Sequence, residues 1–368
     1  MNSFFKGKPY SPNRLFCLDA LRGLDMFLLT VVGPLFWAFH KVFVFSDPVV
    51  KQFRHGWEGF TLWDIIMPLF IFMCGAAMPF ALEKRLKEGP ASFWKHVGFR
   101  VAMLWVLGGC SQGNWAAFDM TKFCPFANTL QSIAIGYLVT AVVMATRVKA
   151  LLVVVPAALA LGYAALLHFC GGYAEFGNLA FKVDQKIFSW IMPPDNSYIA
   201  KPNHYTWFLT SMMFAAMTLS GFLATKILTS AAEKKVRAKR LFAYGAGLLA
   251  FGWAVSPVIP VIKPIFTLSF TAQAMGWSVL ALAVLFVLTD ILMWRRGWGL
   301  ILLYGQFALT AYLFRGFFGR VTNGFTDALT QGFPHLFGKN AAVILTAVAS
   351  AGALTFILLV RRAIKSRD

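Results

Sequence analysis

Long apolar stretches bracketed by charged residues recur along the whole chain, and they constrain its fold more than any other feature. Crossing a bilayer takes about 20 mostly apolar residues in a helix. A helix is the structure of this length that satisfies its own backbone in lipid. The sequence therefore predicts an all-α, polytopic transmembrane helical bundle of about ten spans. The expected spans are 17–40, 60–82, 94–114, 124–146, 149–170, 204–226, 240–262, 265–289, 298–317 and 341–361.

The composition agrees with this prediction. Hydrophobic residues make up 58% of the chain and charged residues 13%, against about 25% charged in an average soluble domain. The mean hydropathy is +0.65. No stretch between the spans is long enough for an independent soluble domain. We therefore expect a single integral membrane domain over residues 1–368, with a cytoplasmic N-terminus (1–14), an outer loop (171–203) and a cytoplasmic tail (362–368).

The net charge of +19 is distributed as a topology signal. Basic residues cluster in alternate connections, which is the pattern expected of cytoplasmic loops, and this arrangement argues against nucleic acid as a partner. Both termini are therefore expected in the cytoplasm, and the expected location is a bacterial inner membrane. The basic face leaves open a second use, the binding of an anionic cofactor from the cytosol. The clusters are Lys84, Arg85, Lys87, Lys95 and Arg100; Arg147 and Lys149; Lys226, Lys234, Lys235, Arg237, Lys239 and Arg240; Arg295 and Arg296; and Arg361, Arg362, Lys365 and Arg367.

The five cysteines show no metal-binding spacing. Cys110 and Cys124 fall near the ends of consecutive spans on one side, so a disulfide is an alternative, but packed free thiols are favoured. No phosphate-binding, dinucleotide-binding, zinc-protease or serine-hydrolase motif is present. We expect no metal.

Charged side chains inside the first two spans are the main functional signal. Asp19, Arg22, Asp25 and Asp64 lie at membrane depth, where an ionisable group costs about 2.5–3.5 kcal/mol or more. They are expected to line a polar cavity. Asp19 and Arg22 share a helical face, which fits either an internal ion pair or, for Arg22, a phosphate contact.

The second span is preceded by His55, which lies about two and a half helical turns before Asp64 if the helix is continuous. In that case the two side chains cannot touch, although a residue of another span could bridge them. An interfacial histidine is commonly solvated or a helix cap. Imidazole is also the side chain best suited to accept a proton near neutral pH, so His55 is a catalytic candidate.

Polar residues also open two later spans. Asn128 and Gln131 share a face of the fourth span and fit either interhelical hydrogen bonds or contacts with substrate hydroxyls. His204 opens the sixth span at a similar depth, with the same two readings.

Several motifs together resemble the transmembrane acetyltransferases related to heparan-α-glucosaminide N-acetyltransferase, particularly the short bacterial type. The matches extend in order over about residues 14–314. They comprise Arg14-Leu15 with Asp19, Arg22 and Gly23; Trp57-Glu58-Gly59-Phe60-Thr61 with Asp64, Pro68, Phe70, Phe72 and Gly75; Leu130-Gln131 with Ile133-Ala134; Gly177-Asn178-Leu179-Ala180 with Val183-Asp184; and Lys263 to Trp277, which contains Ser269.

This resemblance implies transfer of an acetyl group from cytosolic acetyl-CoA to the amine of a glucosamine-type sugar on the outer side. It implies His55 as the catalytic residue, with Asp64 orienting a polar partner or holding the sugar ammonium. Hypothetical substrate-binding residues are Glu58, Asn128, Gln131, Asp184 and His204. Hypothetical coenzyme A-binding residues are Arg14, Asp19, Arg22 and Ser269. Membrane lipids and a second copy of the chain, in a homodimer, are further expected partners.

Two alternatives stay open at this point. Intramembrane acids are typical of secondary transporters, so Asp25 and Asp64 also fit a proton-coupled sugar or amino-sugar transporter. A non-catalytic membrane scaffold is the third interpretation, although buried charge would then be costly without a purpose.

Overall fold

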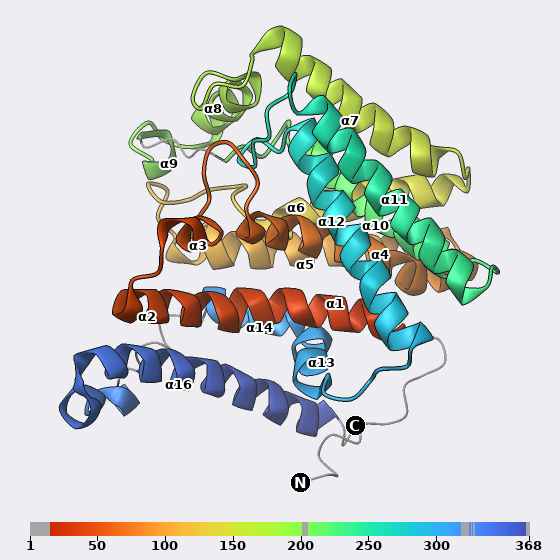
Figure 1. The fold of residues 1–368 in the computed structure, drawn as a ribbon. Coiled ribbons are helices and arrows are strands. Elements are labelled where there is room, and N and C mark those ends of the chain that lie inside the picture. The colour runs from red at the N-terminus through yellow and green to blue at the C-terminus, as the bar shows by residue number, and fades with distance from the viewer. Residues whose placement is uncertain (1–14, 201–204, 318–323, 325, 327, 366–368) are drawn as a thin grey trace. The chain divides into compact units, whose positions relative to one another are not determined.

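The computed structural model describes residues 15–200, 205–317, 324, 326 and 328–365. These residues form helices joined by turns and loops, and none of them lies in a strand (Figure 1). The prediction of an all-α fold is confirmed. Two predicted site residues, Arg14 and His204, lie outside the described residues.

Within the described part of the chain, seven helices are long and apolar enough to cross a membrane, which supports an integral membrane protein. They are Phe16–Phe43, Leu62–Glu88, Thr129–Thr146, Leu151–Cys170, Ser211–Leu228, Leu268–Ile291 and Phe333–Lys365. The three remaining predicted spans are also helical, as α5 (Pro90–Gln112), α11 (Lys234–Val255), and α13 (Gly299–Gln306) with α14 (Ala308–Phe317).

The chain divides into two compact units, residues 1–54 with 284–368 and residues 55–283. The second unit contains α4 (Ile66–Glu88), α5, α6 (Thr129–Thr146), α7 (Leu151–Cys170), α10 (Ser211–Leu228), α11 and most of α12 (Leu268–Phe286). Helix α10 packs against α4, α6 and α7. The α4–α10 contact requires a glycine, because a Cβ at Gly75 would lie 1.8 Å from the carbonyl oxygen of Thr218.

Shorter elements connect the helices of the second unit. The 3-10 turn η2 (Leu62–Ile65) leads into α4, and η3 (Trp115–Ala117) follows α5. The long connection after α7 is itself helical, with α8 (Leu179–Ile191) and α9 (Ser197–Ala200). Helix α11 ends at Val255, and the loop 256–267 leads to α12. Pro257, Pro260 and Pro264 explain why no straight hairpin forms there.

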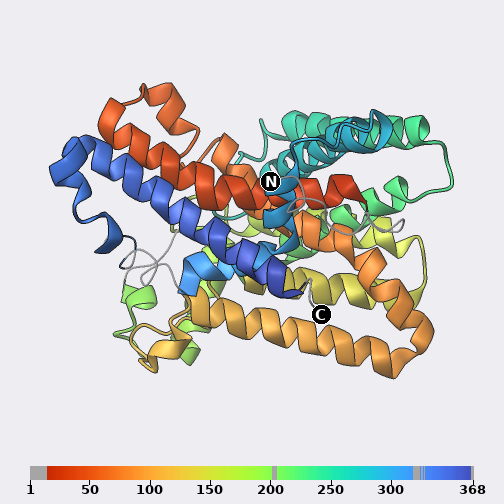
Figure 2. The same cartoon turned by 90° about the horizontal axis from the view of Figure 1, so that it is seen from below.

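In the first unit, α1 (Phe16–Phe27) continues through the π-helical turn η1 (Leu28–Val32) into α2 (Gly33–Phe43), and the short α3 (Asp47–Lys51) follows. A second π-helical turn, η4 (Val287–Ile291), precedes α13. Helix α1 packs on α13, and a Cβ at Gly23 would lie 2.0 Å from the carbonyl oxygen of Ile301. The long α16 (Phe333–Lys365) runs antiparallel alongside α2 (Figures 1 and 2).

All five cysteines are free thiols, and Cys17 and Cys124 are buried. The preference for packed thiols over a bridge between Cys110 and Cys124 is confirmed.

Candidate active site

Asp64 is anchored by the turn that starts the α4 segment. Thr61 is the N-cap of η2, and its backbone N–H and hydroxyl donate to Asp64 Oδ2 at 2.9 and 2.8 Å. This is a capping box, in which the N-cap residue and the residue three positions later satisfy each other's backbone. The Asp64 side chain is buried, so both its position and its orientation are fixed.

His55 contacts the other oxygen of this carboxylate. His55 Nδ1 lies 2.7 Å from Asp64 Oδ1, and the His55 side chain is 39% exposed while that of Asp64 is 3% exposed. One face of the pair is therefore reachable from outside the protein, and the carboxylate lies behind the ring.

Lys263 completes a cluster with these two residues and is buried together with Asp64. Its Nζ lies 3.3 Å from Asp64 Oδ1 and 3.2 Å from His55 Nδ1. Burial lowers the pKa of Lys263 to about 8, and the neighbouring Asp64 opposes this change. The Lys263 side chain is 5% exposed, so its charge depends on its partner rather than on water.

The loop that carries Lys263 is fixed by hydrogen bonds from several parts of the second unit. The backbone N–H of Gly59 donates to Val261 O at 2.8 Å, and that of Thr206 donates to Pro264 O at 3.2 Å. The hydroxyl of Tyr163, on α7, donates to Ile265 O at 2.6 Å. These bonds hold the Lys263 loop against the His55 segment, so the cluster is preorganised.

The hydrogen-bond pattern assigns roles within the cluster. Asp64 accepts from Thr61 at Oδ2 and from Lys263 and His55 at Oδ1. A 2.7 Å contact between an imidazole nitrogen and this oxygen requires a proton, which we place on His55 Nδ1. In the neutral ring the unprotonated nitrogen is then Nε2. A carboxylate that fixes the tautomer in this way is the arrangement that prepares a histidine for general-base or nucleophilic chemistry.

The structure differs from a continuous helix between His55 and Asp64. Residues 52–61 form turns and loop, and Gly59 has a φ of +105°. The chain folds back instead of rising along a helix axis. The two side chains therefore meet directly, although a regular helix would separate them by about 13 Å.

The two amides predicted on the fourth span make hydrogen bonds at the N-terminus of their own helix. The side chain of Asn128 caps α6 by accepting from the backbone N–H of Leu130 and of Gln131 at 2.9 and 3.2 Å. Gln131 accepts from Asn128 Nδ2 and from Ala127, and donates to Pro125 O. Both residues are buried. These bonds explain their place in the fold, and their binding of sugar hydroxyls stays a prediction.

Asp184 lies on α8 and accepts from the backbone N–H of Trp207 at 2.6 Å and of Phe208 at 3.0 Å. Burial raises its pKa to about 7, and the two backbone donors act in the opposite direction. Its carboxylate thus holds the segment that leads into α10. A contact with substrate stays a prediction.

The remaining predicted residues are dispersed. Glu58 is exposed on the loop before Thr61. The hydroxyl of Ser269 is buried and donates to Pro260 O at 2.9 Å. In the first unit, Arg22 lies 3.6 Å from Asp19 with 25% of its side chain exposed. The ion-pair interpretation of these two residues is thus observed, and their binding of coenzyme A stays a prediction.

Lys263 is the site residue that the sequence reasoning missed. The sequence places it only at the start of the family-like stretch Lys263 to Trp277, with no site role. Its signal is the surrounding sequence, Pro260-Val-Ile-Lys263-Pro264-Ile. A single cation within an apolar, proline-rich loop is a candidate for a buried ion pair.

Comparison with known proteins adds no assignment. No protein-family model matches the chain, and no curated protein matches it significantly. Among the described residues, no group of three or more His, Cys, Asp and Glu side chains is arranged to hold a metal ion.

Proposed function

We propose that the chain is a membrane-embedded acetyltransferase in which His55 is the catalytic residue and Asp64 and Lys263 position it. The observation that supports this proposal best is the 2.7 Å contact between His55 Nδ1 and the buried Asp64 carboxylate. The proposed reaction moves an acetyl group from acetyl-CoA to the amine of a glucosamine-type sugar.

The proposed chemistry starts at His55 Nε2. In direct transfer, the sugar amine attacks the thioester carbon, the C–S bond breaks, and Nε2 takes the ammonium proton and delivers it to the departing thiolate. In two-step transfer, Nε2 attacks the thioester carbon, the C–S bond breaks and coenzyme A leaves as its thiolate. The sugar amine then attacks the acetyl carbon, the bond to Nε2 breaks, and the released Nε2 takes the ammonium proton, which passes to solvent or to the thiolate. Asp64 keeps Nδ1 protonated in the ground state and stabilises the imidazolium that forms in either route.

Lys263 has a supporting role in this proposal. It provides the counter-charge for Asp64, because a buried carboxylate without a cation would be costly. Acetyl-CoA would approach from the basic cytoplasmic connections, with Arg14, Asp19, Arg22 and Ser269 as the hypothetical donor-side residues. Its phosphates suit guanidinium groups, which pair with phosphoryl oxygens in bidentate fashion.

The test is transfer of radiolabelled acetyl from acetyl-CoA to glucosamine by the protein in liposomes. We expect His55→Ala to lower the rate by about 10²–10⁴-fold, the usual contribution of a general base. The matched control is His168→Ala, since His168 is also exposed and belongs to the same unit, and its rate should be unchanged. Transfer by His55→Ala at the rate of the unaltered protein would exclude the proposed role.

Rapid denaturation on ice at neutral pH separates the two routes, because an acetyl-imidazole would hydrolyse in acid. After incubation with labelled acetyl-CoA and no sugar, label on the unaltered protein that is absent from His55→Ala indicates the two-step route. Active protein that carries no label indicates direct transfer.

One observation favours a proton-coupled sugar transporter as the second candidate. Asp25 is fully buried in α1, and neither of its carboxylate oxygens has a hydrogen-bond partner among the described residues. An unpaired acid at membrane depth is typical of a proton-carrying site. Uptake of labelled sugar into vesicles, driven by a proton gradient without acetyl-CoA and lost in Asp25→Leu, would favour the transporter. No uptake together with acetyl transfer would favour the enzyme.

A further inference from the structure

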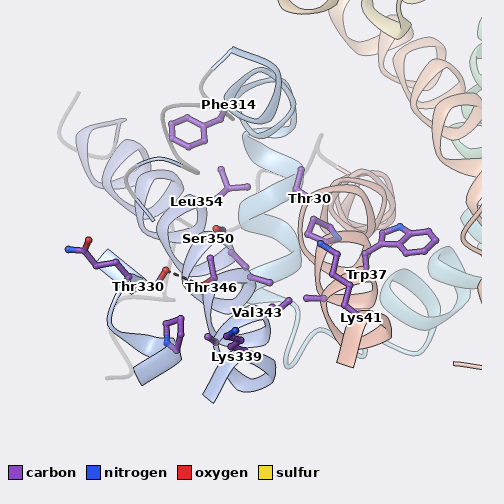
Figure 3. A pocket seen from close by; sticks show the side chains of 17 residues that line it. Thr30, Trp37, Lys41, Phe314, Thr330, Lys339, Val343, Thr346, Ser350 and Leu354 are labelled. Atoms are coloured by element: carbon purple, nitrogen blue, oxygen red, sulfur yellow. Dashed lines mark hydrogen bonds between the residues drawn. The ribbon is translucent and has the colours of Figure 1, made fainter. Parts of the chain in front are cut away.

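A cavity of about 780 Å³ lies within the first unit, lined mainly by α2 and α16, with further residues from η1, α14 and the segment before α16 (Figure 3). This volume is in the range of small-molecule sites, which is about 300–1,000 Å³. Because all of its lining belongs to the first unit, it is separate from the His55 cluster of the second unit. Nothing in the proposed acetyl transfer uses it.

The two main helices that line the cavity run antiparallel, so the end of α2 lies beside the start of α16. The residues at this end of the cavity differ in charge from those at the other end. Lys41 near the end of α2 and Lys339 near the start of α16 line it toward one end, while Thr30 and Leu354 line it toward the other (Figure 3). At 1.5 Å per helical residue, Lys41 lies about 16 Å from Thr30 along the helix axis. The cavity is therefore elongated along the helices, with positive charge at one end.

The walls between the ends are mostly apolar, with Ser350 and Gln331 as polar exceptions. Pro34, Ala38 and Val343 line the cavity directly. The hydroxyl of Thr30 donates to Met26 O at 2.6 Å, and that of Thr346 donates to Thr330 Oγ1 at 3.0 Å. These two hydroxyls are satisfied within the protein, so they do not require a polar group on a bound molecule.

A break in α16 sets the position of one cation. Gly338 has a φ of +79° and a ψ of 159°, which interrupts the helix directly before Lys339. Lys339 therefore starts the long straight part of α16. Lysines at helix ends commonly extend to the membrane surface, and this tendency would be enough to explain a single exposed lysine. It does not explain why Lys41 and Lys339 line the same apolar cavity.

We propose that this cavity binds one phospholipid with an anionic headgroup. An acyl chain lies between α2 and α16, and the headgroup phosphate lies at Lys41 and Lys339. Basic pockets between transmembrane helices on the cytoplasmic side bind anionic headgroups, and the same charge complementarity applies to a phosphate at Lys41 and Lys339. With the N-terminus in the cytoplasm, this lipid belongs to the outer leaflet.

The test uses the full chain, delipidated in detergent and titrated separately with phosphatidylglycerol and phosphatidylcholine of identical acyl chains. Native mass spectrometry counts the bound lipid. We expect tighter binding of phosphatidylglycerol, lost by about 10–30-fold in Lys41→Gln/Lys339→Gln. The matched control is Lys51→Gln/Lys182→Gln, which removes two exposed lysines that do not line the cavity and should bind phosphatidylglycerol as the unaltered protein does.

A second pair of variants tests the acyl-chain part. Ala347→Trp fills the cavity and should abolish binding of both lipids, whereas Val348→Trp places the same bulk on the neighbouring exposed position, which does not line the cavity. Equal affinity for the two lipids would overturn the proposal. So would phosphatidylglycerol binding that survives both Lys41→Gln/Lys339→Gln and Ala347→Trp.

Discussion

At the scale of single residues, the charge of Lys263 is the most sensitive part of the cluster. Its ammonium lies 3.3 Å from Asp64 Oδ1 and is nearly closed off from water. Burial disfavours the charged form, so the pKa is lowered from 10.5 to about 8. The ion pair with Asp64 is consequently lost as the pH rises through about 8.

This predicts a fall in the rate of acetyl transfer above about pH 8, measured as initial rates at saturating substrate from about pH 6.5 to about 10. In Lys263→Arg the fall should disappear, because a guanidinium stays charged over the whole range. Lys263→Met should lower the rate below about pH 8, where the unaltered protein keeps the ion pair, and should flatten the profile. A Lys263→Arg profile that superimposes on that of the unaltered protein would contradict the assignment.

A loss of folding stability would not explain the predicted fall in the rate of acetyl transfer above about pH 8. Between about pH 8 and 10.5 this lysine is neutral in the folded protein but still protonated in the unfolded chain. The unfolded state then binds more protons, so the contribution of Lys263 to the free energy of unfolding increases with pH in this window. Thermal unfolding recorded on the same samples should show no loss of stability caused by Lys263.

Variants of Asp184 test whether this residue stabilises the fold or contacts the substrate. Because its carboxylate accepts two backbone hydrogen bonds, Asp184→Ala leaves buried donors unpaired, at a cost of about 1–3 kcal/mol each. We expect a lower melting temperature in Asp184→Ala and a smaller decrease in Asp184→Asn, which keeps an acceptor. A raised KM for the sugar in either variant, with an unchanged melting temperature, would instead indicate the predicted contact with substrate.

At the scale of helices, close crossings stabilise the bundle. A Cβ at Gly75 would lie 1.8 Å from Thr218 O, so Gly75→Ala must separate α4 from α10. We expect a loss of about 1–3 kcal/mol or more, the range for overpacked cores. The control is Gly98→Ala on α5, where an added Cβ meets nothing within 4 Å and should stabilise the helix by about 0.5–1 kcal/mol. Thermal unfolding in detergent measures both; equal melting temperatures would exclude a tight crossing.

Helix positions could be predicted from the sequence because lipid leaves an apolar stretch of this length few other structures. The first predicted span, 17–40, corresponds to Phe16–Phe43, and the fourth, 124–146, to Thr129–Thr146. The ends are less certain. Hydropathy does not register that Asn128 caps α6, and it therefore starts that span too early.

The site could be predicted only in part for a related reason. His55 and Asp64 were found as separate candidates, but their contact depends on the chain leaving helical geometry before Leu62. The signal was present in Thr61-Leu62-Trp63-Asp64, since Thr followed three residues later by an acid marks a helix start. Lys263 lies 208 residues after His55 in the sequence, and its approach depends on backbone contacts such as Gly59 to Val261. No local pattern encodes such a contact.

At the scale of the whole molecule, α5 decides the topology. It is helical over Pro90–Gln112 but carries charged residues in its first half, and it is not among the seven helices apolar enough to cross a membrane by composition. If α5 crosses, five spans precede the end of α7, and Cys170 lies on the side opposite the N-terminus. If α5 does not cross, Cys170 lies on the same side as the N-terminus.

Labelling of Cys170 shows on which side of the membrane the end of α7 lies, because Cys170 is an exposed free thiol at that end. With a cytoplasmic N-terminus and a crossing α5, we expect a membrane-impermeant maleimide added outside the cells (outer membrane permeabilised, if present) to label the protein. In Cys170→Ser the label at this position should disappear, and tryptic mapping distinguishes it from the half-buried Cys110. Labelling of Cys170 only after the membrane is opened would reduce the number of crossings before it to four. That result would place the α8 connection in the cytoplasm and remove the predicted outer loop 171–203 from the acceptor side.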